Sequence, residues 1–188
     1  MPEKNQILWA PWRMEYLRSL QDDSPQPSCF LCDYAASPDR DRQNLVVWRT
    51  PACLAVLNRY PYTNGHLLIA PLRHLDSLSE LGGAELAELA GMVRDSLDLV
   101  GPVVRADGFN VGMNFGRCAG AGLPDHLHAH VVPRWNGDTN FVPVLGGTRI
   151  IPQDLDELYA QLRRRAADLG LPRGGPVGSP EDGSRARE

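Results

Sequence analysis

Three histidines occupy every second position in the segment DHLHAHVVPRW, residues 125–135. On a helix each residue turns by about 100°, which would point His128 away from the face shared by His126 and His130. On a strand the period is two, so the three imidazoles line one face and the apolar residues between them face a core. The valines that follow and the proline after them favour the strand. Such a row suits nucleophilic chemistry, a metal site or a hydrogen-bonded polar face, and the spacing alone leaves all three open.

Length and charge narrow the class of protein. The 188 residues fit a single domain, long enough to bury a core without disulfide bonds. The net charge of −4 is a poor match to a nucleic-acid backbone, so we expect no nucleic-acid partner. No apolar stretch approaches the length of a membrane span, and the first residues lack the apolar segment of a secretory signal. We therefore expect no membrane association and a cytoplasmic location, where the four cysteines are metal ligands or free thiols.

Turn signals and apolar periodicity divide the chain into short strands and two helices. Strands are predicted at residues 45–48, 53–58, 66–71, 108–115 and along the histidine row. Apolar residues recur at helical spacing across 81–100, and a second helix is predicted for 155–169. Consecutive strands joined by short turns, with one long helix between them, indicate the α+β class with an antiparallel sheet of about five strands.

The predicted domain organisation has three parts. Residues 1–28 are expected to form an N-terminal arm or short helix, and residues 29–170 the folded domain. The final stretch, 171–188, is rich in glycine, proline and charge. It has almost nothing to bury, so it is predicted to be disordered.

The histidine row and its surroundings resemble the histidine-triad nucleotide-binding superfamily. The row has that superfamily's pattern of three histidines alternating with apolar residues, followed by proline and arginine. The upstream segments NRYPYTNGHLLIAPLRH and NVGMNFG are similar as well, so the resemblance runs from about Leu45 to Arg134. LWAPWRMEYL near the start, Trp135 and the following GDTNFVPVLGGTRIIPQ resemble the bacterial diadenosine tetraphosphate phosphorylase branch.

The resemblance implies nucleotidyl transfer by the histidines. A neutral imidazole attacks the α-phosphorus of a nucleotide, releases the rest of the polyphosphate and leaves a nucleotidyl-histidine that phosphate or water cleaves. The resemblance assigns the nucleophile to the middle histidine, His128. It implies that His130 and His66 contact the phosphates and assist the leaving group.

The phosphates and the nucleoside need further contacts. The small residues Gly120, Ala121 and Gly122 let backbone N–H groups approach a phosphate, although flexible turns share this composition. Asn114 is expected to donate its amide to the same phosphate, with the capping of a turn as the alternative. Asn58 matches the superfamily position that touches the ribose region, with a hydrogen bond inside the loop as the alternative.

Two positions bear on the reaction and on the base. Gly122 stands where the superfamily's diadenosine triphosphate hydrolases carry glutamine, and a small residue there agrees with the phosphorylase branch. That branch often has a serine at this point, which glycine does not replace. Trp135 either stacks on a base or packs at a subunit interface.

Cys29 and Cys32 form a CxxC motif, a spacing shared by zinc ligands and redox pairs. Because the motif follows a loop and lacks a strand–CxxC–helix setting, zinc is the preferred interpretation. The resemblance to superfamily members with such a motif implies two further ligands, His74 and His126. Two sulfurs and two nitrogens form a closed tetrahedral set, so the expected Zn²⁺ is structural rather than catalytic.

The expected function is phosphorolysis of diadenosine tetraphosphate to ADP and ATP, with inorganic phosphate as the second substrate. Hydrolysis of the same substrate or of a nucleoside phosphoramidate is the alternative reaction. A nucleotide- or zinc-binding regulatory module is the alternative of a different class, and the retention of all three histidines of the row counts against it. The superfamily also implies at least a homodimer, which continues the sheet across a two-fold axis.

Overall fold

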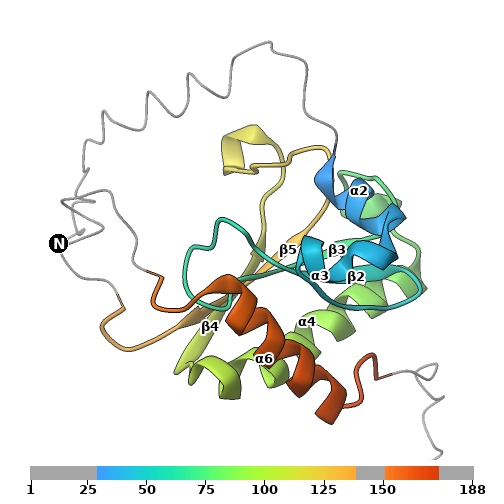
Figure 1. Ribbon diagram of the computed structural model, residues 1–188. Coiled ribbons are helices and arrows are strands. Elements are labelled where there is room, and N and C mark those ends of the chain that lie inside the picture. The colour runs from blue at the N-terminus through green and yellow to red at the C-terminus, as the bar shows by residue number, and fades with distance from the viewer. Residues whose placement is uncertain (1–28, 139–150, 174–188) are drawn as a thin grey trace, which may run out of the picture.

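The computed structural model describes residues 29–138 and 151–173, in which one antiparallel sheet carries helices on both faces (Figure 1). The strand order is β1-β2-β3-β5-β4, so β1 and β4 are the edge strands. The strands are β1 (Val46–Arg49), β2 (Cys53–Leu57), β3 (Leu67–Pro71), β4 (Gly108–Met113) and β5 (Ala129–Arg134). The α-helices are α2 (Phe30–Ala36), α3 (Asp41–Asn44), α4 (Gly83–Val104) and α6 (Leu155–Asp168). The predicted α+β class, the five strands, the long helix and the C-terminal helix are confirmed.

The central strands β2 and β3 are continuous apolar runs because both of their faces are covered. Every residue of these two strands is buried. On one face a larger core packs against α4 and α6, and on the other a smaller core packs against α2 (Figure 1). Burial on both sides explains why these strands lack the alternation of polar and apolar residues that a half-exposed strand shows.

The two long helices begin at side-chain caps. At the start of α4, the Glu85 carboxylate accepts the backbone N–H of Gly82 at 2.9 Å. At the start of α6, the Asp154 carboxylate accepts the backbone N–H groups of Asp156 and Glu157 at 2.9 and 3.1 Å. α4 runs beyond the predicted end at residue 100 and continues through Pro102. A proline in the last turn removes only one hydrogen bond of the helix, so the helix tolerates it.

The described chain continues past α6 into the stretch predicted as a tail. The backbone N–H of Leu171 donates to Ala166, and Arg173 pairs with Asp95 and Asp98 of α4 at 3.3 and 3.1 Å. The predicted N-terminal arm, the segment 139–150 and residues 174–188 lie outside the described residues. Among the helices of the described part, none is both long and apolar enough to cross a membrane.

The histidine row is only partly a strand, which corrects the prediction. β5 begins at Ala129, so His126 and His128 lie in the irregular segment before it. The reason is that the backbone N–H of Leu127 donates to Leu75, in the loop after β3, at 2.6 Å. The side chains nevertheless still alternate between the two faces, because Leu127, Ala129 and Val131 all belong to the larger core.

Candidate functional site

Four side chains from three separate segments meet beside α2. Cys29 is the N-cap residue of α2 and Cys32 lies in its first turn, so the CxxC motif opens a helix that was not predicted from the sequence. Cys29 Sγ lies 3.1 Å from His126 Nδ1, and Cys32 Sγ lies 3.2 Å from His74 Nδ1. All four ligand atoms lie within 4.8 Å of one another. The structure therefore brings together the four residues named as metal ligands.

The chemistry of this group fits a closed site with two sulfur and two nitrogen ligands. His126 Nε2 donates to the carbonyl of Pro71 at 2.9 Å, which leaves the lone pair on Nδ1, the atom that faces the sulfurs. Burial lowers the pKa of His126 and keeps the ring neutral, as a metal ligand must be. Burial, followed by the hydrogen bond with Cys29, raises the pKa of Cys32 to about 11. A bound divalent cation would offset this cost by stabilising the thiolates.

His128 has one ring nitrogen fixed by the backbone. Its Nδ1 donates to the carbonyl of His126 at 2.8 Å, which in a neutral ring leaves the lone pair on Nε2. Burial lowers the pKa of His128 and outweighs the opposing effect of this hydrogen bond. A neutral imidazole with an unprotonated Nε2 is a nucleophile near neutral pH.

His66 and His130 are joined by a hydrogen bond of 2.9 Å between His66 Nε2 and His130 Nδ1. On the other side of His66, Nδ1 accepts the backbone N–H of Tyr62 at 3.1 Å and lies 3.2 Å from the amide nitrogen of Asn58. His66 therefore carries its proton on Nε2 and donates to His130. Burial, and then the charge of His128, lower the pKa of His130 to about 4, so that ring is neutral with its proton on Nε2.

The neighbouring rings of His128 and His130 thus differ in whether Nε2 is protonated. The ring centroids of His128 and His130 lie 4.9 Å apart in an edge-to-face arrangement. Nε2 of His128 holds a lone pair, whereas Nε2 of His130 holds a proton. A lone pair and an N–H group side by side are what a nucleophile and a hydrogen-bond donor to the same phosphate require.

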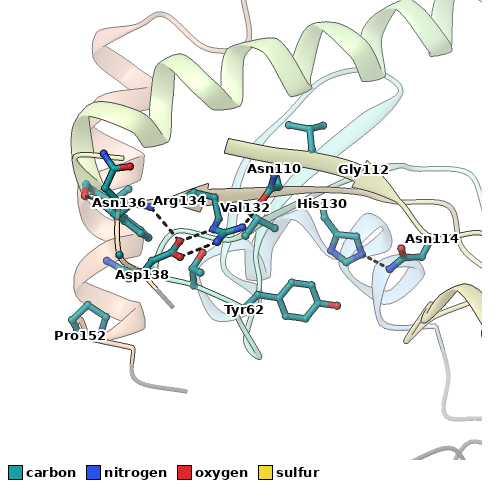
Figure 2. A pocket seen from close by; sticks show the side chains of 16 residues that line it. Tyr62, Asn110, Gly112, Asn114, His130, Val132, Arg134, Asn136, Asp138 and Pro152 are labelled. Carbon is teal, nitrogen blue, oxygen red and sulfur yellow. Dashed lines mark hydrogen bonds and ion pairs between the residues drawn. The ribbon is translucent and has the colours of Figure 1, made fainter. Parts of the chain in front are cut away.

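Asn114 follows β4 directly and places its amide nitrogen 3.5 Å from His130 Nε2 (Figure 2). Because that ring nitrogen carries a proton, both groups are donors, and one acceptor that lies beside the two nitrogens and contacts both would satisfy them. Gly120 and Gly122 lie in the loop between β4 and β5, and a Cβ added to either would meet nothing within 4 Å. Ala121 between them is buried. Binding of a phosphate by this loop stays a prediction.

A cleft of about 930 Å³ opens beside His130 (Figure 2). Arg134 lines it and is held by Asp138 at 2.5 Å and by Asn110 at 2.6 Å. Trp135 lines the same cleft, and its indole N–H donates to two carbonyls at the end of α4, at 2.7 and 3.2 Å. These hydrogen bonds hold the indole of Trp135 against the end of α4. Stacking of the ring on a base stays a prediction.

Tyr62 contributes to the site although no sequence pattern predicted it. Its backbone N–H bonds to His66, and its ring is stacked on His130 with centroids 5.7 Å apart. A backbone donor leaves no mark on a sequence, so no pattern could have revealed it. For Asn58 the structure shows the hydrogen bond inside the loop that was given as the alternative, directed at His66. Its contact with a ribose stays a prediction.

Sequence comparison finds one family model that covers the histidine row. The model described as HIT domain matches residues 40–137, more than half of the chain. The match begins after Cys32, so the CxxC motif lies outside it. An AP-4-A phosphorylase from Mycobacterium tuberculosis is 42% identical over 151 residues, which cover 79% of this chain and 77% of the relative.

Two solved structures have the same fold. A zinc-bound histidine triad family protein from Mycobacterium smegmatis superposes with a TM-score of 0.62 at 29% identity, over 76% of this chain and 96% of that chain. A hypothetical histidine triad nucleotide-binding protein from Sulfolobus tokodaii superposes with a TM-score of 0.60 at 28% identity, over 75% and 93% of the two chains.

Proposed function

The chain belongs to the HIT domain family, and on this basis we propose that it is an enzyme that cleaves dinucleoside polyphosphates by nucleotidyl transfer. The proposed reaction is phosphorolysis of diadenosine tetraphosphate to ADP and ATP. The observation that carries the proposal is the hydrogen bond from His128 Nδ1 to the carbonyl of His126, which leaves Nε2 as a nucleophile. The identity of 42% to an AP-4-A phosphorylase supports the substrate class.

In the first step, His128 Nε2 attacks the α-phosphorus of the substrate. The N–P bond forms while the bond from this phosphorus to the bridging oxygen breaks, and ATP leaves with the electron pair. His130 Nε2 and the amide of Asn114 donate hydrogen bonds to the phosphate oxygens that gain charge. His66 keeps the ring of His130 in place through the hydrogen bond between them.

In the second step, an oxygen of inorganic phosphate attacks the nucleotidyl group on His128. The N–P bond breaks, the imidazole regains its lone pair and ADP leaves. The small residues Gly120 and Gly122 leave room for the phosphate, and the amide of Asn114 donates to it. Water in the place of phosphate would give AMP, which is the hydrolytic alternative.

The metal in this proposal is a structural Zn²⁺ held by Cys29, Cys32, His74 and His126. When bound, it cross-links α2 to the two segments that carry the histidine ligands. The zinc-bound relative from Mycobacterium smegmatis supports the choice of metal. All four ligand positions are filled by the protein, so no substrate atom needs the metal.

The products formed with and without inorganic phosphate test the reaction. We expect ADP and ATP when diadenosine tetraphosphate and phosphate are both present. Equal rates of AMP and ATP formation in both samples would identify a hydrolase instead. Two ADP molecules formed without phosphate would place the attack at another phosphorus and contradict the mechanism.

The variant His128→Asn tests the nucleophile. We expect turnover to fall by at least about 1,000-fold while nucleotide binding, followed by calorimetry, stays close to that of the wild type. A covalent nucleotidyl-protein should form in a single turnover of the wild type and be missing from the variant. An active variant would move the nucleophile to another residue.

A further inference from the structure

We propose that Asn58 is a positioning residue that, together with the backbone N–H of Tyr62, fixes the tautomer of His130 through His66. In this arrangement His130 presents an N–H group, rather than a lone pair, to the substrate. The inference rests on the proposed function, in which His130 contacts the phosphates. It differs from a contact between Asn58 and the ribose, because it acts on the chemical step and not on nucleotide binding.

The orientation of the Asn58 amide is set by its own loop. Its side-chain oxygen accepts the backbone N–H of Tyr60 at 3.0 Å, so the amide nitrogen must be the atom that faces His66 Nδ1, 3.2 Å away. Its backbone N–H donates to the carbonyl of His66 at 2.9 Å, which holds the two residues side by side. Asn58 is thus a donor to His66 and not an acceptor.

A second donor points at the same nitrogen. The backbone N–H of Tyr62 lies 3.1 Å from His66 Nδ1. A ring nitrogen that faces two N–H groups has to offer a lone pair, so neutral His66 holds its proton on Nε2. His66 is fully buried, which favours the neutral ring.

The tautomer of His66 determines the tautomer of His130 through the hydrogen bond between the two rings. His66 Nε2 donates to His130 Nδ1 at 2.9 Å, so the proton of neutral His130 must be on Nε2. That atom lies next to the amide of Asn114, and both can donate to one phosphate oxygen. The opposite tautomer would present a lone pair and repel that oxygen.

The step needs only a hydrogen bond from His130. The leaving group is a polyphosphate, whose terminal oxygens are already largely ionised near pH 7, since the second phosphate pKa is about 6. Its new oxygen anion is therefore stable without a full proton. The proton stays on His130 Nε2, and the pair His66–His130 supplies orientation and electrostatic stabilisation.

Two substitutions at Asn58 separate this role from others. Asn58→Asp has the same shape but only accepts hydrogen bonds, so it draws a proton onto His66 Nδ1. Asn58→Ala removes one donor and leaves the backbone N–H of Tyr62, so the tautomer should persist. A long-range proton–nitrogen NMR spectrum of protein with ¹⁵N-labelled histidine reports which ring nitrogen is protonated, whether or not the enzyme turns over.

We expect the Asp variant to show His66 protonated on Nδ1 and to lose activity with rising pH. In this variant at low pH, both ring nitrogens of His66 are protonated, and Nε2 still donates to His130 Nδ1. At high pH His66 loses the proton on Nε2, so His130 Nδ1 must donate to it instead. The rings of His130 and Tyr62 also face His66. Near pH 8 we expect kcat of Asn58→Asp to fall about 100-fold with KM within about threefold, and that of Asn58→Ala to fall less than about 10-fold.

Three outcomes would overturn the inference. They are an unprotonated His66 Nδ1 in Asn58→Asp, equal kcat values and equal pH profiles for the two variants, or an effect confined to KM. The last result would assign Asn58 to the ribose instead. If the wild type does not cleave diadenosine tetraphosphate, the proposed function fails, while the NMR spectra still decide the tautomers.

Discussion

At the residue scale, the proposed use of inorganic phosphate depends most on the side chain of Asn114. Its amide lies 3.5 Å from His130 Nε2 at the end of β4. Loss of one hydrogen bond to a charged group costs about 1.5–3 kcal/mol, or roughly one to two decades of rate. We expect Asn114→Ala to raise KM for phosphate by about 10- to 100-fold and KM for the dinucleotide by much less.

Initial rates measured over a matrix of both substrate concentrations give the two constants. Asn44→Ala, at the end of α3, is the matched control and should leave both unchanged. An equal rise of both constants in Asn114→Ala would assign this amide to the nucleotide, and no rise in either would remove it from the site.

His130 links the site to stability. Burial and the charge of His128 lower its pKa to about 4 in the folded protein, whereas an unfolded histidine has a pKa of about 6.5. Between these values the unfolded state binds more protons, so protonation favours unfolding. The stability conferred by neutral His130 is complete above about pH 6.5 and is lost as the pH falls toward 4.

The variant His130→Gln removes this titration. We expect its unfolding free energy, from urea titrations, to fall less steeply than that of the wild type between about pH 6.5 and 4.5. His66 and His128 also face this ring and remain in the variant, so some dependence on pH should remain. Curves of equal slope for the two proteins would mean that His130 has an ordinary pKa.

At the scale of elements, Gly65 joins the loop before β3 to α4. Its φ of +82° is left-handed, and an added Cβ would lie 2.9 Å from a methyl group of Val100. We expect Gly65→Ala to lower the unfolding free energy by about 3 kcal/mol, from the backbone strain and the clash together. Gly91→Ala, within α4 and with open space around it, should be neutral or stabilising by up to about 1 kcal/mol. Similar midpoints of denaturation for both variants would contradict this account of Gly65.

The cluster of Cys29, Cys32, His74 and His126 is the other junction between elements, because it brings α2 against the loop after β3 and the segment before β5. We expect Cys32→Ser to bind zinc about 100-fold more weakly and so to lose it during purification. The lost binding free energy should lower the melting temperature by about 5–10 °C. The exposed Cys118 offers the control, since Cys118→Ser should change neither zinc content nor melting temperature. Wild-type protein that holds far less than one zinc per chain would refute the site.

The sequence predicted the elements whose residues repeat and missed those set by single contacts. The apolar runs of β2 and β3 and the helical spacing of α4 follow from burial on regular elements. α2 is a helix of seven residues, too short to show a period. The start of β5 depends on the bond between Leu127 and Leu75, 52 positions apart, which no local pattern shows.

In the candidate site, too, the sequence predicted which residues take part but not the single contacts that set their protonation. Resemblance was enough to name the four residues of the Cys29, Cys32, His74 and His126 cluster, because cysteine and histidine are residue types that a motif records. The protonation states of His128 and His66 depend on the carbonyl of His126 and on the backbone N–H of Tyr62. Every residue but proline has such an N–H group, so only the fold decides which one faces an imidazole.

At the scale of the whole molecule, the sheet has one protected edge and one open edge. On β1 the hydroxyl of Tyr159 and the guanidinium of Arg163, both on α6, donate to the carbonyls of Val46 and Val47 at 3.1 and 2.6 Å. No strand among residues 29–138 and 151–173 pairs with the outer edge of β4, where Val111 is 49% exposed. An open edge with an exposed valine is a template for pairing with another chain.

We therefore expect a homodimer in which two copies of β4 pair across a two-fold axis and continue the sheet. Val111→Lys should convert this dimer to a monomer, because it brings two like charges together at the paired edge. Leu86→Lys is the matched control, since Leu86 is 45% exposed on α4, away from this edge, and should keep the mass of the wild type. Sedimentation velocity at micromolar concentration gives the mass of each protein. A monomeric wild type, or a Val111→Lys variant that remains dimeric, would rule out assembly through β4.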